Sequence, residues 1–340
     1  MKNKIKVAII GTGRIGLSSE FDSRRLKPAS HFGMWLKNKD CNLVSICDKN
    51  KSAFAKAKKL KKNIKFYNNY KDMIKVEKPD IISICTWKDT HFSITKECLK
   101  LGIKVIVLEK PLANNLIQAK TLVKLVKKNK AKILVNHRRR YDEEIIKLKR
   151  KINNGIIGDI LQVSSFYVYG ILTTGTHLID TLRMLLKDRL GDVNKVIGIK
   201  NKLNNFKPKD DKNIDGFLLF KNNILASIQS LDMKSYDNFD IIIYGRKGKI
   251  EITDVGRRVL HYKIIKSPEH MGFTELTRKP IDLCKPKPRN QFGYLSKNAV
   301  LCLKSKNTIP LCDENDSLKD MDIINKLIAS SKSNGKVIKV

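Results

Sequence analysis

The feature that most constrains the fold is a glycine-rich turn that directly follows the first apolar run of the chain. Ile5–Ile10 is typical of a buried strand, and the next six residues are Gly11-Thr12-Gly13-Arg14-Ile15-Gly16. The three glycines permit a tight turn and let backbone N–H groups approach a pyrophosphate at a helix N-terminus. A strand that runs into G-x-G-x-x-G predicts the first unit of a dinucleotide-binding parallel sheet. A purely structural glycine turn is the alternative.

Residues 1–136 alternate short apolar runs with stretches of helical periodicity, a pattern typical of βαβ units. The expected strands are Ile5–Ile10, Leu43–Cys47, Ile81–Cys85, Val105–Leu108 and Ile133–Val135. The expected helices are Ser52–Leu60, Tyr70–Val76, His91–Lys100 and Leu116–Lys128. Pro28 should break the first crossover before a helix restarts at a Ser30 cap, which leaves Ser18–Ser30 as a loop. We predict an N-terminal NAD(P)-binding Rossmann domain over residues 1–136.

Residues 137–340 show a different pattern, in which half-exposed strands follow one another. The expected strands are Leu161–Tyr169, Gly216–Phe220, Ala226–Leu231, Asp240–Tyr244, Lys249–Thr253 and a short terminal strand at Lys336–Val340. The expected helices are Glu143–Asn153, a segment near His177–Leu186, and Ser317–Ser331. Strands that alternate in this way predict an α+β domain on an open, largely antiparallel sheet. We expect this domain to bind substrate and mediate oligomerisation, with the last helix and tail able to pack back on the Rossmann domain.

The charge balance is strongly basic, with 69 Lys and Arg against 33 Asp and Glu and a formal net charge of +36. The excess is mostly scattered Lys, whereas nucleic-acid modules gather basic and aromatic residues on one element, so we expect no nucleic-acid partner. The seven Cys form no CxxC pair and no His/Cys ligand spacing, which indicates reduced, buried thiols and no metal site. We find no secretion signal and no long apolar run, and expect a cytoplasmic protein with no membrane partner.

The end of the second strand carries the residue that bears on cofactor choice. Asp48 can accept hydrogen bonds from the adenosine ribose and would repel a 2′-phosphate, which favours NAD over NADP. Asp48 could instead cap the next helix, and the neighbouring Lys49 could partly accommodate a phosphate.

Three further motifs carry a family resemblance over nearly the whole chain. They are Glu109-Lys110-Pro111 after the fourth strand, Arg138-Arg139-Arg140-Tyr141-Asp142 at the domain junction, and Gly175-Thr176-His177-Leu178-Ile179-Asp180. Together with the glycine turn and a closing helix followed by Gly335, they resemble the Gfo/Idh/MocA family, which includes glucose-fructose oxidoreductase and inositol dehydrogenase. The resemblance implies a Rossmann domain followed by an α/β domain whose sheet joins subunits into a dimer or tetramer.

The resemblance also implies hydride transfer between a sugar-like carbon and nicotinamide C4. Lys110 matches the family's active-site lysine and His177 its general acid/base, while Pro111 should fix the backbone, with a cis bond as one option. Thr173, His177 and Asp180 are spaced i, i+4, i+7, which predicts one polar helical face on which Asp180 binds a substrate hydroxyl. Sugar dehydrogenases of the family commonly carry Asp in place of Thr173, so we expect a lower pKa for His177 here.

Other positions match the family's binding residues. Cofactor contacts are expected from Gly11, Thr12, Gly13, Arg14, Ile15, Gly16, Asp48, Thr86, Trp87, His91, Glu109 and Lys110. Substrate contacts are expected from Lys110, Arg139, Tyr167, Tyr169, Thr173, His177 and Asp180. Because Tyr167 and Tyr169 lie two apart on an expected strand, they should project to one face, where sheet packing is an equal alternative.

These observations favour an NAD(H)-dependent oxidoreductase acting on a sugar, a cyclitol or a nucleotide-activated amino sugar, as in surface-polysaccharide synthesis. The basic surface and the uncharged Thr173 favour an acidic or activated substrate. The alternative is a catalytically silent NAD-binding sensor of the same fold, against which the retained Glu109-Lys110-Pro111 and His177 argue. A nucleic-acid binder would be a third class, for which the sequence offers no motif.

Overall fold

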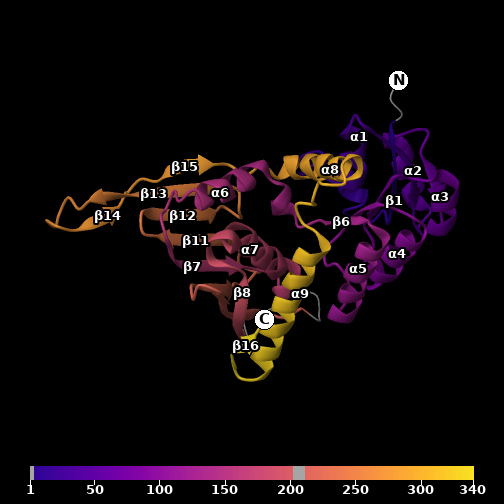
Figure 1. The fold of residues 1–340 in the computed structure, drawn as a ribbon. Coiled ribbons are helices and arrows are strands. Elements are labelled where there is room, and N and C mark those ends of the chain that lie inside the picture. The colour runs from indigo at the N-terminus through magenta and orange to yellow at the C-terminus, as the bar shows by residue number, and fades with distance from the viewer. Residues whose placement is uncertain (1–3, 202–210) are drawn as a thin grey trace. The chain divides into compact units, whose positions relative to one another are not determined.

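The computed structural model describes residues 4–201 and 211–340, and the chain divides into two compact units (Figure 1). The first comprises Met1–Tyr141 and Arg289–Lys319, and the second Asp142–Pro288 and Asp320–Val340. The sequence predicted a domain boundary at residue 136, with the last helix and tail able to pack back on the first domain. The chain instead returns to the first unit with residues 289–319, and the last helix is shared between the two units because its residues from Asp320 onward belong to the second.

The first unit is built on a six-stranded parallel sheet with the order β3-β2-β1-β4-β5-β6. Its strands are β1 (Ile5–Ile10), β2 (Cys41–Cys47), β3 (Lys65–Tyr67), β4 (Ile81–Ile84), β5 (Val105–Leu108) and β6 (Lys132–Val135). The central strands are buried on both faces, as their continuous apolar runs predicted. Only β3 was missed, because a three-residue edge strand that is mostly half-exposed has no apolar pattern to detect. The predicted Rossmann sheet is confirmed.

Helices flank this sheet (Figure 1). They are α1 (His31–Lys37), α2 (Ser52–Leu60), α3 (Tyr70–Glu77), α4 (Lys88–Lys100), α5 (Leu116–Asn129) and α8 (Pro288–Lys304), with short 3-10 turns η1 (Ser18–Phe21) and η2 (Arg138–Tyr141). The predicted Ser30 cap is confirmed, since its hydroxyl accepts the Gly33 N–H at 3.1 Å. Helix α8 was not predicted, although its buried Phe292, Leu295 and Ala299 have helical spacing.

The second unit is built on a ten-stranded mixed sheet with the order β14-β13-β12-β11-β7-β10-β9-β8-β16, and β15 pairs with β13. Its strands are β7 (Ile160–Tyr167), β8 (Val193–Lys200), β9 (Ile214–Phe220), β10 (Leu225–Ser230), β11 (Phe239–Gly245), β12 (Gly248–Thr253), β13 (Arg258–Lys266), β14 (Thr274–Leu276), β15 (Ile281–Cys284) and β16 (Ile338–Lys339). Among the described strands of this sheet, only β7 and β10 pair in parallel. The largely antiparallel sheet is therefore confirmed, while β8, β13, β14 and β15 were missed.

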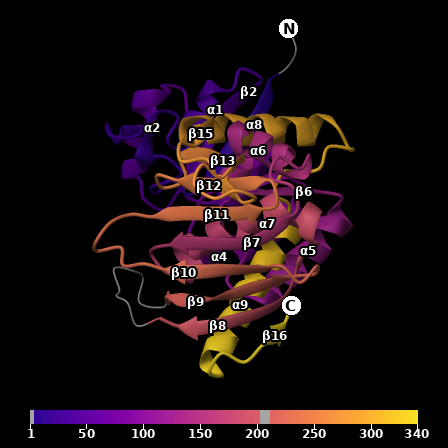
Figure 2. The same cartoon turned by 90° about the vertical axis from the view of Figure 1, so that its left-hand side faces the viewer.

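One face of this sheet is covered and the other is open. Helices α6 (Glu143–Asn153) and α7 (Thr176–Leu190) lie on one face, whereas Figure 2 shows the strands of the opposite face without a helix in front. Burial alternates accordingly along β11, where Ile241 and Ile243 are buried and Tyr244 is exposed. From Asp320 onward α9 (Glu314–Lys332) joins the same core, and Gly198 gives it room, because a Cβ there would lie 2.2 Å from the Leu327 carbonyl oxygen.

The seven cysteines are all unpaired thiols, six of them buried, as the sequence predicted. Across the described residues, no helix combines the length and the apolar character needed to span a bilayer.

Candidate functional site

The candidate site of the first unit lies at the carboxyl edge of the parallel sheet. Segments that follow adjacent strands are joined there by backbone hydrogen bonds, since Gly11 N–H donates to Cys47 O at 2.9 Å and Glu109 N–H to Ile84 O at 3.0 Å. The sheet order reverses at β1, which has β2 on one side and β4 on the other. Parallel sheets bind ligands in the crevice outside such a switch point. The glycine turn, Asp48, Thr86 and Glu109-Lys110 all follow strands at this edge.

The three glycines of the turn differ in their backbone conformation and in the space available for a Cβ atom. Gly11 has a φ of +90°, and a Cβ there would lie 2.8 Å from the backbone of Cys85. A Cβ on Gly16 would lie 2.1 Å from the carbonyl oxygen of Gly11. A Cβ on Gly13 would meet no atom within 4 Å, so this position faces open space. Gly11 and Gly16 therefore keep the turn tight, and Gly13 leaves room for a ligand to approach the backbone.

The turn carries a row of unsatisfied backbone donors. Among the described residues, the N–H groups of Gly13, Arg14, Ile15 and Gly16 donate to no protein acceptor. Successive N–H groups in a turn form a concavity that binds anions, and it is the feature that a pyrophosphate requires. These donors lie in the turn where the sequence predicted contacts with a pyrophosphate, and the contact itself stays a prediction.

The predicted loop over Ser18–Ser30 and the helix restart after Ser30 are confirmed, so no α-helix begins directly after the turn, which corrects the helix N-terminus predicted at the pyrophosphate. Residues 17–30 form an excursion with a single 3-10 turn, and α1 begins only at His31. The first N–H groups of α1 are already used, since His31 donates to Ile15 O at 3.0 Å and Phe32 to Gly16 O at 2.9 Å. Helix α1 is therefore docked on the glycine turn, and the turn itself presents the donors.

Asp48 holds the turn from the neighbouring strand. Its Oδ2 accepts the Thr12 N–H and the Thr12 hydroxyl, both at 2.6 Å, and its Oδ1 accepts the Asn50 N–H at 2.9 Å. Partial burial alone would raise the pKa of Asp48, but these hydrogen bonds outweigh it and lower the pKa. An ionised carboxylate therefore stands beside the turn. The predicted role at the adenosine ribose stays a prediction.

His91 is buried and links two loops by hydrogen bonds, whereas the sequence predicted it as a cofactor contact. It is 1% exposed, with Nδ1 2.7 Å from Pro111 O and Nε2 3.0 Å from Thr86 O. It therefore ties the loop after β4 to the segment after β5, and direct contact between His91 and a cofactor is not supported by this burial. Trp87, on the same loop, is 85% exposed. The Lys110–Pro111 bond is cis, as one of the two options predicted.

Glu109 anchors a buried polar network that no local sequence pattern indicated. Its Oε1 accepts hydrogen bonds from His31 Nε2 at 2.8 Å and Asn136 Nδ2 at 2.6 Å. The other His31 nitrogen lies 3.2 Å from the Ser83 hydroxyl, which accepts the Trp35 indole N–H. Burial would raise the pKa of Glu109, but His31, Asn136 and the adjacent Lys110 lower it. The residue before the predicted catalytic lysine is thus a fixed negative charge.

The arginine motif divides into structural and half-exposed residues. Arg140 is buried, donates to Leu311 O and forms an ion pair with Asp316 at 2.6 Å. The Arg138 guanidinium lies 5.6 Å from the centre of the Phe292 ring on α8. Both side chains therefore hold the returning segment 289–319 on the first unit. Arg139 is half-exposed, and its predicted contact with substrate stays a prediction.

In the second unit, Tyr167 is not a substrate contact, which corrects a prediction. Strand β7 ends at Tyr167, whose side chain is fully buried in the core with its hydroxyl bonded to both the N–H and the carbonyl of Ile214. Burial raises the pKa of Tyr167. Tyr169 lies beyond the strand with a φ of 74°, so the two tyrosines do not share a strand face. Of the pair, only half-buried Tyr169 can approach a ligand.

The segment of Thr173 and His177 is held by a carboxylate distant in sequence. Thr173 lies in a π-helical turn (η3, Ile171–Gly175) rather than in the α-helix expected, and π-helical turns often occur at functional sites. Asp211 caps this turn, accepting the N–H groups of Leu172 and Thr173 at 2.8 Å each. His177 follows in the first turn of α7 and is half-buried, whereas Asp180 is buried. Asp211 was missed because no local pattern links it to η3.

Comparison with known proteins agrees with this site. Residues 5–137 match the family described as "Oxidoreductase family, NAD-binding Rossmann fold", that is, Gfo/Idh/MocA. The uncharacterized oxidoreductase YhhX of Escherichia coli is 26% identical over 57% of this chain and 59% of its own length. The inositol 2-dehydrogenase of Serratia proteamaculans is 27% identical over 54% of this chain and 55% of its own length. The chain thus spans little more than half of each relative.

Two solved structures share the fold along the whole chain. The WlbA dehydrogenase of Bordetella pertussis, crystallised with NADH and UDP-GlcNAcA, has a TM-score of 0.79 at 19% identity and covers 100% of this chain and 99% of its own. A super-repressor mutant of Gal80p from Saccharomyces cerevisiae has a TM-score of 0.80 at 15% identity, with coverages of 99% and 98%. The resemblance seen in the sequence is therefore confirmed. Residues 5–137 thus match the Gfo/Idh/MocA oxidoreductase family, and the two solved structures share the fold of the whole chain.

Proposed function

We propose that the protein is an NAD(H)-dependent oxidoreductase that transfers a hydride between nicotinamide and a carbinol carbon of a sugar-like substrate. The observation that carries the proposal is the row of four unsatisfied N–H groups in the glycine turn, with the ionised Asp48 beside it. The donors suit a pyrophosphate, and the carboxylate suits the two ribose hydroxyls of NAD better than a 2′-phosphate. The bound cofactor supplies the nicotinamide ring that accepts or donates the hydride.

Lys110 and His177 move the proton in this proposal. Lys110 follows the fixed carboxylate of Glu109 at the carboxyl edge of the sheet, where its ammonium can hydrogen-bond the reacting hydroxyl. His177 exchanges the proton of that hydroxyl as general acid/base. Arg139, Tyr169 and Thr173 are the proposed ligands of the remaining hydroxyl or charged groups, as the family resemblance implies. Asp180, predicted for the same role, is 1% exposed, and this burial does not support contact with a substrate. A sugar, a cyclitol or a nucleotide-activated amino sugar fits this set of donors and acceptors.

The test is a titration followed by a turnover screen. NAD and NADP are titrated separately by calorimetry, and free sugars, cyclitols and nucleotide sugars are then added while the absorbance of reduced nicotinamide is followed. We expect NAD to bind more tightly than NADP and at least one substrate class to reduce it. If neither dinucleotide binds the folded protein, the proposal is wrong.

The second candidate is a catalytically silent NAD-binding sensor, which the fold likeness to the Gal80p repressor mutant favours. It predicts that NAD binds and that no substrate class changes its absorbance. For either function we propose a cytoplasmic homo-oligomer, a dimer or tetramer, joined through the helix-free face of the ten-stranded sheet. Light scattering of wild type and of Tyr244→Glu, placed on that face, tests this: a variant with unchanged mass contradicts it.

A further inference from the structure

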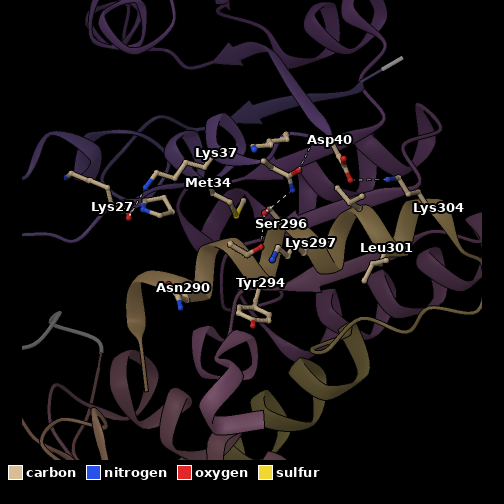
Figure 3. Close-up of a pocket in the computed structure, with 15 residues that line it drawn as sticks. Lys27, Met34, Lys37, Asp40, Asn290, Tyr294, Ser296, Lys297, Leu301 and Lys304 are labelled. Carbon is tan, nitrogen blue, oxygen red and sulfur yellow. Dashed lines mark hydrogen bonds and ion pairs between the residues drawn. The ribbon is translucent and has the colours of Figure 1, made fainter. Parts of the chain in front are cut away.

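A basic groove lies on the first unit, lined by none of the residues at the carboxyl edge described above. It has a volume of about 970 Å³ and runs between α1, the chain on either side of α1, and α8 (Figure 3). Small-molecule sites commonly enclose about 300–1,000 Å³. Two segments far apart in the sequence form its walls, 27–40 and 290–304.

Lysine dominates the charge of this groove. Its lining includes Lys27, Lys37, Lys39, Lys297 and Lys304, against a single carboxylate, Asp40. Asp40 is bound to Lys304, with 3.0 Å between Oδ2 and Nζ. Four positive charges of the lining therefore have no compensating carboxylate in it. Each further ammonium placed beside the others costs free energy, which a bound anion would recover.

Two of these ammonium groups are held in place by neutral acceptors. Lys27 Nζ donates to the carbonyls of Ser19 at 3.0 Å and Asp22 at 2.7 Å, and Lys37 Nζ donates to the carbonyl of Lys27 at 3.0 Å. Carbonyls restrain the side chains but leave the charge unneutralised, so part of the entropy cost of ordering them for a ligand is already met. This arrangement differs from a surface lysine that moves freely in solvent.

The rest of the lining is apolar or offers neutral polar groups. Met34 and Val300 are buried beneath the groove, and Lys297 lies 5.5 Å from the centre of the Tyr294 ring. The Asn38 amide donates to the Ser296 hydroxyl at 3.1 Å across the two walls. An aromatic ring and apolar side chains among ammonium groups suit an organic molecule with anionic substituents better than a bare ion.

We propose that this groove binds a phosphate-bearing small organic molecule, at a site separate from the dinucleotide site of the glycine turn. The compact charge of each lysine matches a phosphate oxygen, and the apolar floor takes the organic part. The proposal does not depend on the proposed oxidoreductase activity, since it uses none of the residues assigned to it.

The test uses inorganic tripolyphosphate as the probe and calorimetry as the measurement. Each titration is run with and without saturating NAD, so that the comparison of groove and control variants holds whether or not the glycine turn is occupied. The groove variant is the double substitution Lys39→Glu and Lys297→Glu, whose side chains form no ion pair with any described residue. The matched control is Lys124→Glu with Lys128→Glu, two exposed residues of α5 that carry the same change of charge. We expect the groove variant to lose about tenfold or more in affinity and the control less than about threefold.

A lysine-modification experiment gives a second, independent result. Acetylation of the wild type, followed by mass spectrometry, should be slowed by tripolyphosphate at Lys39 and Lys297 and unchanged at Lys124. Equal losses of affinity in the two double variants, or equal protection of all three lysines, would show that the anion responds only to overall charge and would overturn the proposal. Absence of binding to the wild type would overturn it as well.

Discussion

The two units present their chemistry from different kinds of position. In the first unit the candidate residues follow parallel strands, so each is placed at the same edge by the strand before it. In the second unit Thr173 and His177 lie on a π-helical turn and the helix after it, and a carboxylate distant in sequence, Asp211, caps that turn. Strand topology positions the first group, whereas tertiary contacts position the second.

The buried charges of the two units differ in the same way. Glu109 in the first unit is surrounded by hydrogen-bond donors at the candidate site. Arg183 in the second unit joins α7 to Asp192 at 2.8 Å and to Asp320 on α9 at 2.6 Å, far along the chain. Burial would lower the pKa of Arg183, but the two carboxylates raise it overall. The Glu109 carboxylate therefore lies at the candidate site. The Arg183 guanidinium instead holds together the helices of the second unit, which carries Thr173 and His177.

The largest expected effect is on turnover, at Lys110. Lys110→Met removes the proposed proton-transfer group and should lower kcat by about 10²–10⁴-fold, with NAD affinity changed by less than about threefold. His177→Ala should lower kcat by a similar factor, which would show that both units supply chemistry. Lys124→Met, on the exposed face of α5, is the control. A His177→Ala variant with normal turnover over the whole pH range would remove His177 from the mechanism.

The second prediction tests the framework role of Arg183. Arg183→Met removes the ion pairs of Arg183 with Asp192 and with the buried Asp320 and should lower the free energy of unfolding by about 3–5 kcal/mol. Chemical denaturation measures this loss. Adding Asp320→Leu to the variant should restore part of the stability, because the buried carboxylate that has lost its ion pair with Arg183 is removed. A loss below about 1 kcal/mol in the single variant would contradict the role.

The difference between the units explains which structural features could be predicted from the sequence and which could not. Apolar runs that alternate with helical patterns, together with the glycine turn, predicted the parallel sheet and the residues at its carboxyl edge. This succeeded because each strand and the residues that follow it are adjacent in the sequence. The same reasoning failed for Tyr167, whose burial depends on Ile214 in another strand, and for Asp211 and the Arg183 network, which join distant segments. It also failed for His31, because the excursion 17–30 separates that residue from the turn on which it packs. Contacts of this kind leave no periodic signal in a single sequence.

The third prediction concerns the pH dependence of Glu109. Because its folded-state pKa lies below the ordinary value of 4.5, its contribution to stability is present above about pH 4.5 and is lost as the pH falls through the folded-state pKa. Glu109→Gln should therefore be about 1–3 kcal/mol less stable than the wild type near pH 7, with the difference shrinking in acid. Thermal or chemical unfolding at several pH values measures this. A difference that stays constant down to acid pH would show that the ionised carboxylate is not what stabilises the network.

The smallest expected effect is at Asp211. Its substitution should separate the two units, because it should change turnover through the second unit and leave NAD binding by the first unit unchanged. In Asp211→Asn one carboxylate oxygen becomes an NH₂ group, which cannot accept the N–H of Leu172 or Thr173. The turn before His177 should loosen, and kcat/KM should fall about tenfold while NAD affinity stays unchanged, because the glycine turn belongs to the other unit.

Asp215→Asn provides the matched control for this substitution. Asp215 is also a hydrogen-bonded carboxylate of the second unit, accepting the Ser230 N–H at 2.7 Å. Within the described residues its hydrogen bonds come from Asn201 and Ser230, and none comes from η3 or α7. The two variants should lose similar stability, by about 1 kcal/mol each, because each loses a hydrogen bond to a charged acceptor. Only Asp211→Asn should lose catalytic efficiency. If both variants lost it equally, the decline would follow from general weakening of the second unit, and Asp211 would have no particular part in placing His177.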